Sequence, residues 1–85
     1  MNLSVNSSLY DVVELAEITF YPNPTSGMLT FSKEIEKIEV IDNIGKIVMR
    51  FFDTKQINIE TLPSGAYYLR MTIGDKTIIR KVIKE

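Results

Sequence analysis

The feature that most constrains this sequence is the spacing of its apolar residues, which recur at every second position from Ile18 onward. Side chains of a β-strand alternate between the two faces of a sheet, so this spacing predicts strands with one buried face. Tyr67 and Leu69, for example, fall on one face, and Tyr68 falls on the other. No helical pattern of ten residues lies between these segments, which argues against a parallel sheet with crossover helices.

Turn-forming residues divide this pattern into about seven short strands. Proline, glycine, asparagine and aspartate gather at residues 22–27, 42–45 and 62–65, and Gly74-Asp75 is typical of a two-residue type II′ hairpin. The expected strands are residues 18–21, 28–32, 35–41, 46–52, 56–60, 66–73 and 76–83. Turns every 8–12 residues or so are typical of an antiparallel sandwich. The sequence therefore predicts an all-β, Ig-like antiparallel β-sandwich.

Residues 1–17 precede this pattern and differ from it. The first of them are small and polar, as in a linker, and contain two matches to the N-glycosylation pattern that we take as chance. Residues 9–15 fit either a short helix or an edge strand. Three acidic residues stand where a signal peptide has its apolar run: Asp11, Glu14 and Glu17. We therefore expect residues 18–85 to be one domain of a longer exported protein, preceded by a linker that could include a first strand.

The composition argues against an enzyme. The chain has no histidine and no cysteine, so the usual Ser-His and Cys-His pairs and cysteine metal sites cannot form. Glu34, Glu36 and Glu39 could supply a glycosidase pair, but side chains on the solvent face of a strand explain them better. The turns that contain Asp42 and Asp75 lack the spaced ligands of a calcium loop. We expect no catalytic residue, no metal and no cofactor.

Binding surfaces leave few clues in the sequence. Net charge is −1 without a long basic run, which argues against nucleic acid and an anionic membrane surface. No stretch approaches the ~20 apolar residues needed to span a bilayer, so no direct membrane insertion is expected. Phe20, Phe31, Phe51 and Tyr67 fall on apolar faces and are expected in the core, whereas Tyr10, Tyr21, Tyr68 and Phe52 are expected at the surface, where they could stack on sugars. Four basic residues near the end either protect an edge strand or form a recognition site: Lys76, Arg80, Lys81 and Lys84.

Four blocks of the sequence together resemble one known family. Residues 21–27 read YPNPTSG, residues 38–48 read IEVIDNIGKIV, residues 62–70 read LPSGAYYLR, and residues 76–84 form a lysine-bearing strand. These blocks, in this order, resemble the type A C-terminal sorting domains of the type IX secretion system. The resemblance covers residues 18–85 and leaves residues 1–17 unmatched.

The resemblance implies a function in protein export in Bacteroidota. Domains of this family stand at the C-terminus of cargo that first enters the periplasm. An outer-membrane translocon with its shuttle proteins then recognises the domain, and a surface sortase removes it. The expected partners are this machinery and an N-terminal cargo domain in the same chain, and the expected location is the cell surface or the medium. The alternative is an accessory Ig-like or fibronectin-like module that binds carbohydrate or spaces domains.

The matching positions also suggest roles for individual residues. Gly27, Gly45 and Gly65 are expected to permit tight turns that a Cβ would strain, and Gly27 is expected to allow a positive φ at the end of its turn. The last hairpin ends at an edge strand to which a receptor could add a strand. We expect recognition to depend most on Gly65, Tyr67, Lys81 and Lys84. Residues with an expected structural role are Pro22, Asn23, Pro24, Gly27, Asp42, Gly45, Lys46, Leu62, Pro63 and Leu69.

Overall fold

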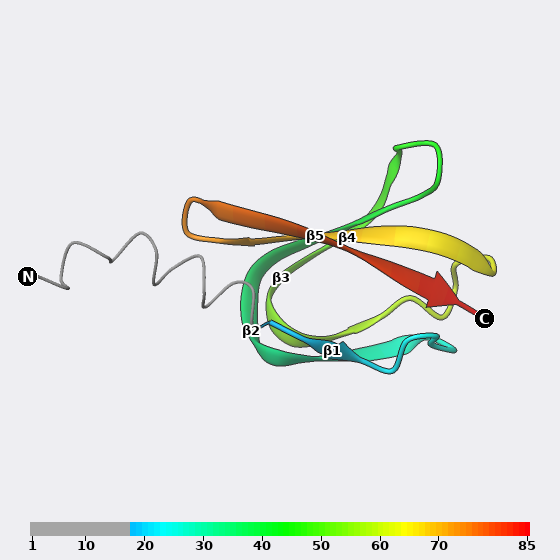
Figure 1. The fold of residues 1–85 in the computed structure, drawn as a ribbon, viewed down its shortest axis with the longest axis horizontal. Coiled ribbons are helices and arrows are strands. Elements are labelled where there is room, and N and C mark those ends of the chain that lie inside the picture. The colour runs from blue at the N-terminus through cyan, green and yellow to red at the C-terminus, as the bar shows by residue number, and fades with distance from the viewer. Residues whose placement is uncertain (1–17) are drawn as a thin grey trace, which may run out of the picture.

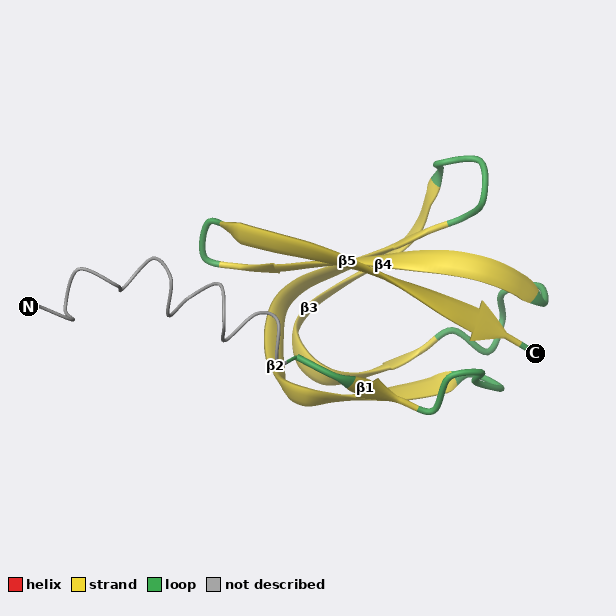
Figure 2. Ribbon diagram, in the orientation of Figure 1, coloured by secondary structure: helices red, strands yellow, loops and turns green. Residues whose placement is uncertain are grey.

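The computed structural model describes residues 18–85, which form five β-strands and no helix (Figure 1, Figure 2). The strands are β1 (Phe20–Tyr21), β2 (Met28–Ile41), β3 (Ile47–Asn58), β4 (Gly65–Ile73) and β5 (Lys76–Lys84). The linker, the first strand and the glycosylation matches considered for residues 1–17 lie outside the described residues. Within residues 18–85 no helix is long and apolar enough to cross a membrane.

The five strands belong to one antiparallel sheet in which β2 is the central element. The order is β1-β2-β4-β5, and β3 pairs with the other edge of β2. Because β2 has 14 residues, its first part pairs with β1 through Phe20 and Phe31, and its last part pairs with β4 through Val40 and Leu69. β3 follows β2 along both parts.

The all-β class is confirmed, but the sheet differs from the sandwich of seven strands. Residues 28–32 and 35–41 form one strand, and most of residues 46–52 and 56–60 form another. The polar residues between them contain neither proline nor glycine, so the chain bends without leaving the sheet. The bends are a register shift between Thr30 and Ile35 and a positive φ of 50° at Asp53.

These bends curl the sheet around a single apolar core. Figure 1 shows β1 and the first part of β2 lying opposite β4 and β5. Phe20 and Phe31 pack against each other there, with ring centroids 5.6 Å apart. The buried apolar residues are Ile18, Leu29, Phe31, Ile35, Ile38, Val40, Ile57, Ile59, Tyr67, Leu69, Met71 and Val82. Curling thus gives one sheet an enclosed interior that two packed sheets were expected to provide.

The hairpin between β4 and β5 forms as predicted. Ile73 pairs with Lys76, which leaves a loop of two residues. Gly74 has a φ of 62°, and Asp75 is not among the residues of the described chain with positive φ. Positive φ at the first loop position alone is the type II′ geometry, in which glycine is the favoured residue.

Candidate functional site

The first contact of the site joins the proline-rich loop to the last strand. The side chain of Asn23 donates from Nδ2 to the carbonyl of Lys81 at 3.2 Å and accepts at Oδ1 from the N–H of Ile83 at 3.0 Å. An amide side chain carries a donor and an acceptor, like a backbone peptide group, so Asn23 occupies the place of a neighbouring strand. The peptide bonds before Pro22 and Pro24 are both cis.

Thr25 continues this contact with its backbone. Its N–H donates to Ile83 O at 2.9 Å, and its carbonyl accepts from Glu85 N at 2.8 Å, which makes a parallel bridge with Lys84. The Thr25 hydroxyl is buried, donates to Met28 O and accepts from Gly27 N. The loop therefore closes the curled sheet onto residues 81–85. We call this contact, made by Asn23 and Thr25, the clip.

Gly27 has a role other than the one expected. It does not have a positive φ, so the expectation of a strained turn at this position was wrong. Instead, a Cβ at Gly27 would lie 2.8 Å from Glu60 Cβ and 3.0 Å from Glu60 Cα. Glycine is needed here because the loop passes close to the chain that follows β3, where Gly27 O accepts from Ile59 N at 2.8 Å.

The block from residue 62 to 70 lies beside the last strand. Gly65 opens β4 with a φ of 153°, which side-chain-bearing residues rarely adopt, and pairs with Lys84. Tyr67 is only 6% exposed, and its hydroxyl donates to Pro63 O at 2.7 Å. Leu69 is fully buried, and Leu62 packs against the same core. The core positions expected for Tyr67 and Leu69 are confirmed.

Asp42 organises the turn after β2. Its Oδ1 accepts from Ile44 N at 3.0 Å and from Lys46 N at 2.9 Å, and its backbone bonds to Lys46 and Gly45. Gly45 has a φ of 89°, so its expected role in a tight turn is confirmed. Among residues 18–85 no cluster of three acidic residues could hold a metal ion. The Asp42 carboxylate thus serves the turn.

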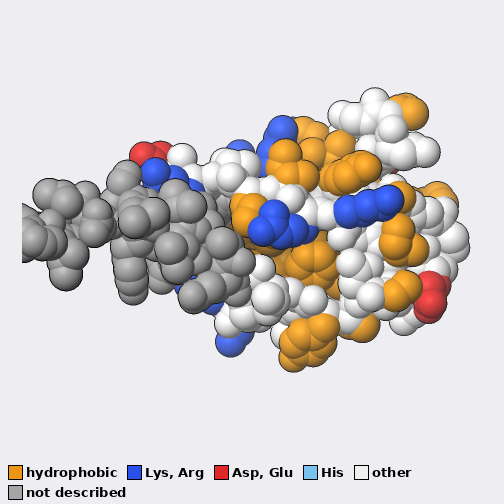
Figure 3. All heavy atoms as spheres, viewed as in Figure 1, with side chains coloured by type: hydrophobic (Ala, Val, Ile, Leu, Met, Phe, Trp, Pro, Cys, Tyr) orange, Lys and Arg blue, Asp and Glu red, His pale blue; other side chains and the backbone are white. Residues whose placement is uncertain are grey.

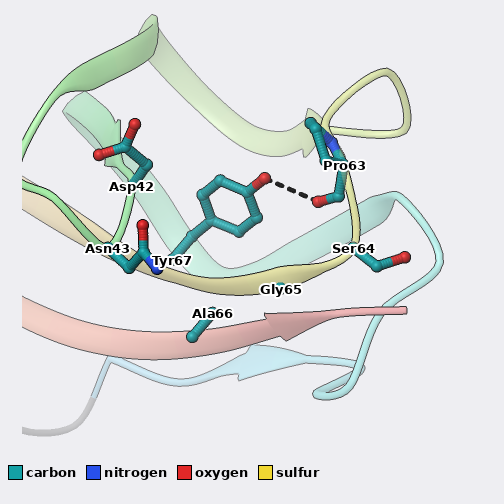
Figure 4. A pocket seen from close by; sticks show the side chains of 7 residues that line it. All are labelled: Asp42, Asn43, Pro63, Ser64, Gly65, Ala66 and Tyr67. Carbon is teal, nitrogen blue, oxygen red and sulfur yellow. Dashed lines mark hydrogen bonds between the residues drawn. The ribbon is translucent and has the colours of Figure 1, made fainter.

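A pocket of about 240 Å³ lies where the turn after β2 meets the start of β4 (Figure 4). Figure 4 shows the Tyr67 ring between Asp42 and Asn43 on one side and Pro63 on the other. The remaining lining residues are Ser64, Gly65 and Ala66. The pocket has one carboxylate, and that carboxylate already accepts two backbone N–H groups, so it offers no acid–base pair.

Of the three glutamates considered for an acid–base pair, Glu39 and Glu36 have partners of their own. Glu39 is 4% exposed and bonds to Arg70 Nε at 2.7 Å and to Arg50 Nε at 3.2 Å. The hydrogen bond from Arg70 is the main cause that lowers the pKa of Glu39, while burial acts in the opposite direction. Glu36 accepts from Gly74 N at 2.9 Å, and Glu34 is exposed.

The basic residues of β5 do not form one surface. Lys81 and Arg80 are exposed, and Lys76 is partly buried. Lys84 is only 8% exposed, and its Nζ donates to Glu85 O at 2.9 Å. The side chain of Lys84 therefore contributes little contact surface, while its backbone pairs with Gly65 and its neighbours Ile83 and Glu85 bond to the clip.

The aromatic side chains do not form a sugar-stacking platform in the described structure. Phe31 and Tyr67 are buried, and Phe20 and Phe51 pack against the core, as expected. Tyr21, Phe52 and Tyr68 are exposed, also as expected, while Tyr10 lies outside the described residues. Phe52 pairs with Lys37 and Tyr68 with Ile41, four positions along β2, which is about 13 Å. Tyr21 lies on β1, on the opposite side of the curl.

Thr25 belongs to the site's framework but was not singled out from the sequence, and Glu39 was considered only as a candidate acid–base residue on a solvent face. Both depend on partners that are distant in the chain, and no local pattern identifies them. In a comparison with known families, the model described as "Secretion system C-terminal sorting domain" matches residues 19–85. A search of the curated proteins gave no match.

Proposed function

Because this chain belongs to the family of C-terminal sorting domains of the type IX secretion system, we propose that residues 18–85 address an attached cargo protein to the outer-membrane translocon. In this proposal the cargo reaches the periplasm first, the translocon and its shuttle proteins bind the domain, and a surface sortase removes it. The cargo then stays at the cell surface or enters the medium. We infer these steps from the membership of the chain in this family.

The observation that carries the proposal is the convergence of the family's blocks at one end of the domain. The clip fixes the first block to residues 81–85, where the last block ends. The third block lies on the other edge of β5, where Gly65 pairs with Lys84 and Tyr67 with Val82. Three blocks that are far apart in sequence thus form one folded structure that another protein can read.

Within this structure the expected recognition residues have different roles. Gly65 and Tyr67 set the backbone and packing at the start of β4, and Lys84 holds the end of β5. Lys81 is the member of the set whose charged side chain is exposed. We therefore assign direct contact with the machinery to Lys81 and support of that surface to the other three.

The proposal includes no catalytic step by the domain. In support, the sequence has no histidine or cysteine. Glu36 and Glu39 are bound to partners of their own, and the pocket near Tyr67 has one carboxylate.

Export of a fused reporter tests the proposal. The full chain is fused to the C-terminus of a periplasmic fluorescent protein and expressed in a host with a type IX system and in the same host without the translocon. We expect fluorescence in the medium or on the surface only when the translocon is present. Equal distribution in the two hosts would refute the proposed function.

A charge reversal separates recognition from folding. Lys81→Glu is compared with Lys55→Glu, because both lysines are exposed and the second lies on β3, away from the clip. We expect Lys81→Glu to retain more of the reporter in the periplasm while both variants unfold at the same urea concentration. Equal export of the two variants would show that Lys81 is not part of the recognition surface.

A further inference from the structure

The outer edge of β5 is only partly closed. In an antiparallel strand, successive residues direct their backbone N–H and C=O groups to opposite edges. The N–H groups of Ile83 and Glu85 point to the clip, so those of Thr77, Ile79 and Lys81 point to the same edge. Within residues 18–85, no acceptor meets these three N–H groups.

This open edge carries both positive charge and exposed apolar surface. Arg80 and Lys81 are the exposed basic residues in this stretch of β5, which contains no acidic residue. Ile79, at the centre of the open stretch, is 53% exposed. Figure 3 shows Lys and Arg side chains among apolar ones over β4 and β5, while the visible acidic side chains lie toward the two ends of the domain. An extended acidic segment with apolar residues matches this edge.

The chain itself contains a segment with these properties. All ten basic residues of the protein lie in residues 18–85, whereas residues 9–17 (LYDVVELAE) carry three acidic residues and no basic one. The other residues of this segment are apolar or aromatic. Cross-strand pairs of opposite charge and of apolar side chains both favour pairing.

The described chain starts close enough to β5 for residues 9–17 to reach the open edge of that strand. Thr19 bonds to Ser32 in β2, and Glu36, four residues further along, bonds to Gly74 in the turn before β5. The distance along β2 from Ser32 to Glu36 is about 13 Å. The nine residues of the segment, when extended, span up to about 30 Å, so they can cover this distance and continue along β5. The chain at Thr25 runs parallel to β5. If the chain reverses its direction just before Ile18, residues 9–17 therefore run antiparallel to β5.

We propose that residues 9–17 of this chain bind along the open edge of β5, over residues 77–81. A second copy of the domain fits this edge less well, because its β5 would bring a second exposed Arg80 and Lys81 against the pair already there. Tethering also favours the segment, because its covalent connection to Ile18 holds it near the edge of β5 at an effective concentration in the millimolar range. The contact goes beyond the sorting function and does not depend on it.

Amide hydrogen exchange of the purified full chain, followed residue by residue by NMR, tests the proposal. In dilute solution we expect slow exchange at Thr77, Ile79 and Lys81. Val12→Pro and Val13→Pro together should accelerate exchange at these amides at least tenfold, because in a strand one of two consecutive residues must face its partner and proline has no N–H. Replacing the three acidic residues of the segment by lysine should have the same effect.

Two controls make the result interpretable. The amides of Ile78 and Val82 face β4 and should stay protected in every variant, which reports that the domain is folded. Ser7→Pro and Ser8→Pro together place the same change outside the segment and should alter nothing. Fast exchange at the open edge in the unsubstituted chain would overturn the proposal. Protection of these amides that survives the valine substitutions would also overturn the proposal. Protection that is lost on dilution would overturn it too, because it would identify a second copy of the chain as the occupant.

Discussion

Replacing Asn23 by alanine tests whether the clip holds the domain together. The substitution removes two hydrogen bonds, to Lys81 O and from Ile83 N, that join residues 58 and 60 positions apart. A neutral hydrogen bond contributes about 0.5–1.5 kcal/mol net. Both bonds are accessible to solvent, so water can replace them on β5 and no buried group is left without a partner. We therefore expect a loss of about 1–2 kcal/mol in the free energy of unfolding.

Urea unfolding of the full chain, followed by circular dichroism, measures this loss. The matched control is Asn43→Ala, because within residues 18–85 the Asn43 side chain makes no hydrogen bond and the residue is exposed. That control should change the unfolding free energy by less than about 0.5 kcal/mol. For a domain of this size, 1–2 kcal/mol lowers Tm by about 4–16 °C. If Asn23→Ala and Asn43→Ala have equal stability, the clip does not contribute as described.

Three further substitutions test other contacts by urea unfolding. Gly27→Ala should destabilise by about 1–3 kcal/mol, because its Cβ would meet the backbone of Glu60; an unchanged midpoint would refute the close approach. Tyr67→Phe should cost about 1 kcal/mol through loss of the bond to Pro63 O, and no loss would argue against that bond. Glu39→Gln should cost about 1 kcal/mol at pH 7, since its arginine partners are partly exposed. The pKa of Glu39 is lowered in the folded state, so its contribution is present above the ordinary value of 4.5 and disappears as pH falls through the folded pKa. The difference between Glu39→Gln and the unsubstituted chain should therefore shrink from pH 7 to pH 3, and a constant difference would contradict the ion pairs.

The parts of the fold that depend on neighbouring residues could be predicted from the sequence. Alternation alone assigned Tyr67 and Leu69 to the core and Tyr68 to the surface, because the two faces of a strand differ at every step. The type II′ hairpin followed from Gly74, since few other residues accept positive φ at that position.

The parts that depend on distant residues could not be predicted. Residues 33–34 and 53–55 interrupt the apolar pattern and indicate strand ends, but pairing between β2 and β3 continues beyond both bends. Glu39 was expected on a solvent face, and only the register with β3 and β4 places two arginines beside it. The clip likewise joins residues about 60 positions apart, and no local rule brings them together.

The central claim is that the secretion machinery recognises the folded end of the domain around β5 as the sorting signal. The most direct measurement is the location of the fluorescent reporter fused to this chain with residues 76–85 deleted, in a host whose type IX system is intact. The account predicts that the truncated fusion stays in the periplasm while the full fusion leaves the cell. Export of the truncated fusion at the level of the full one would contradict it.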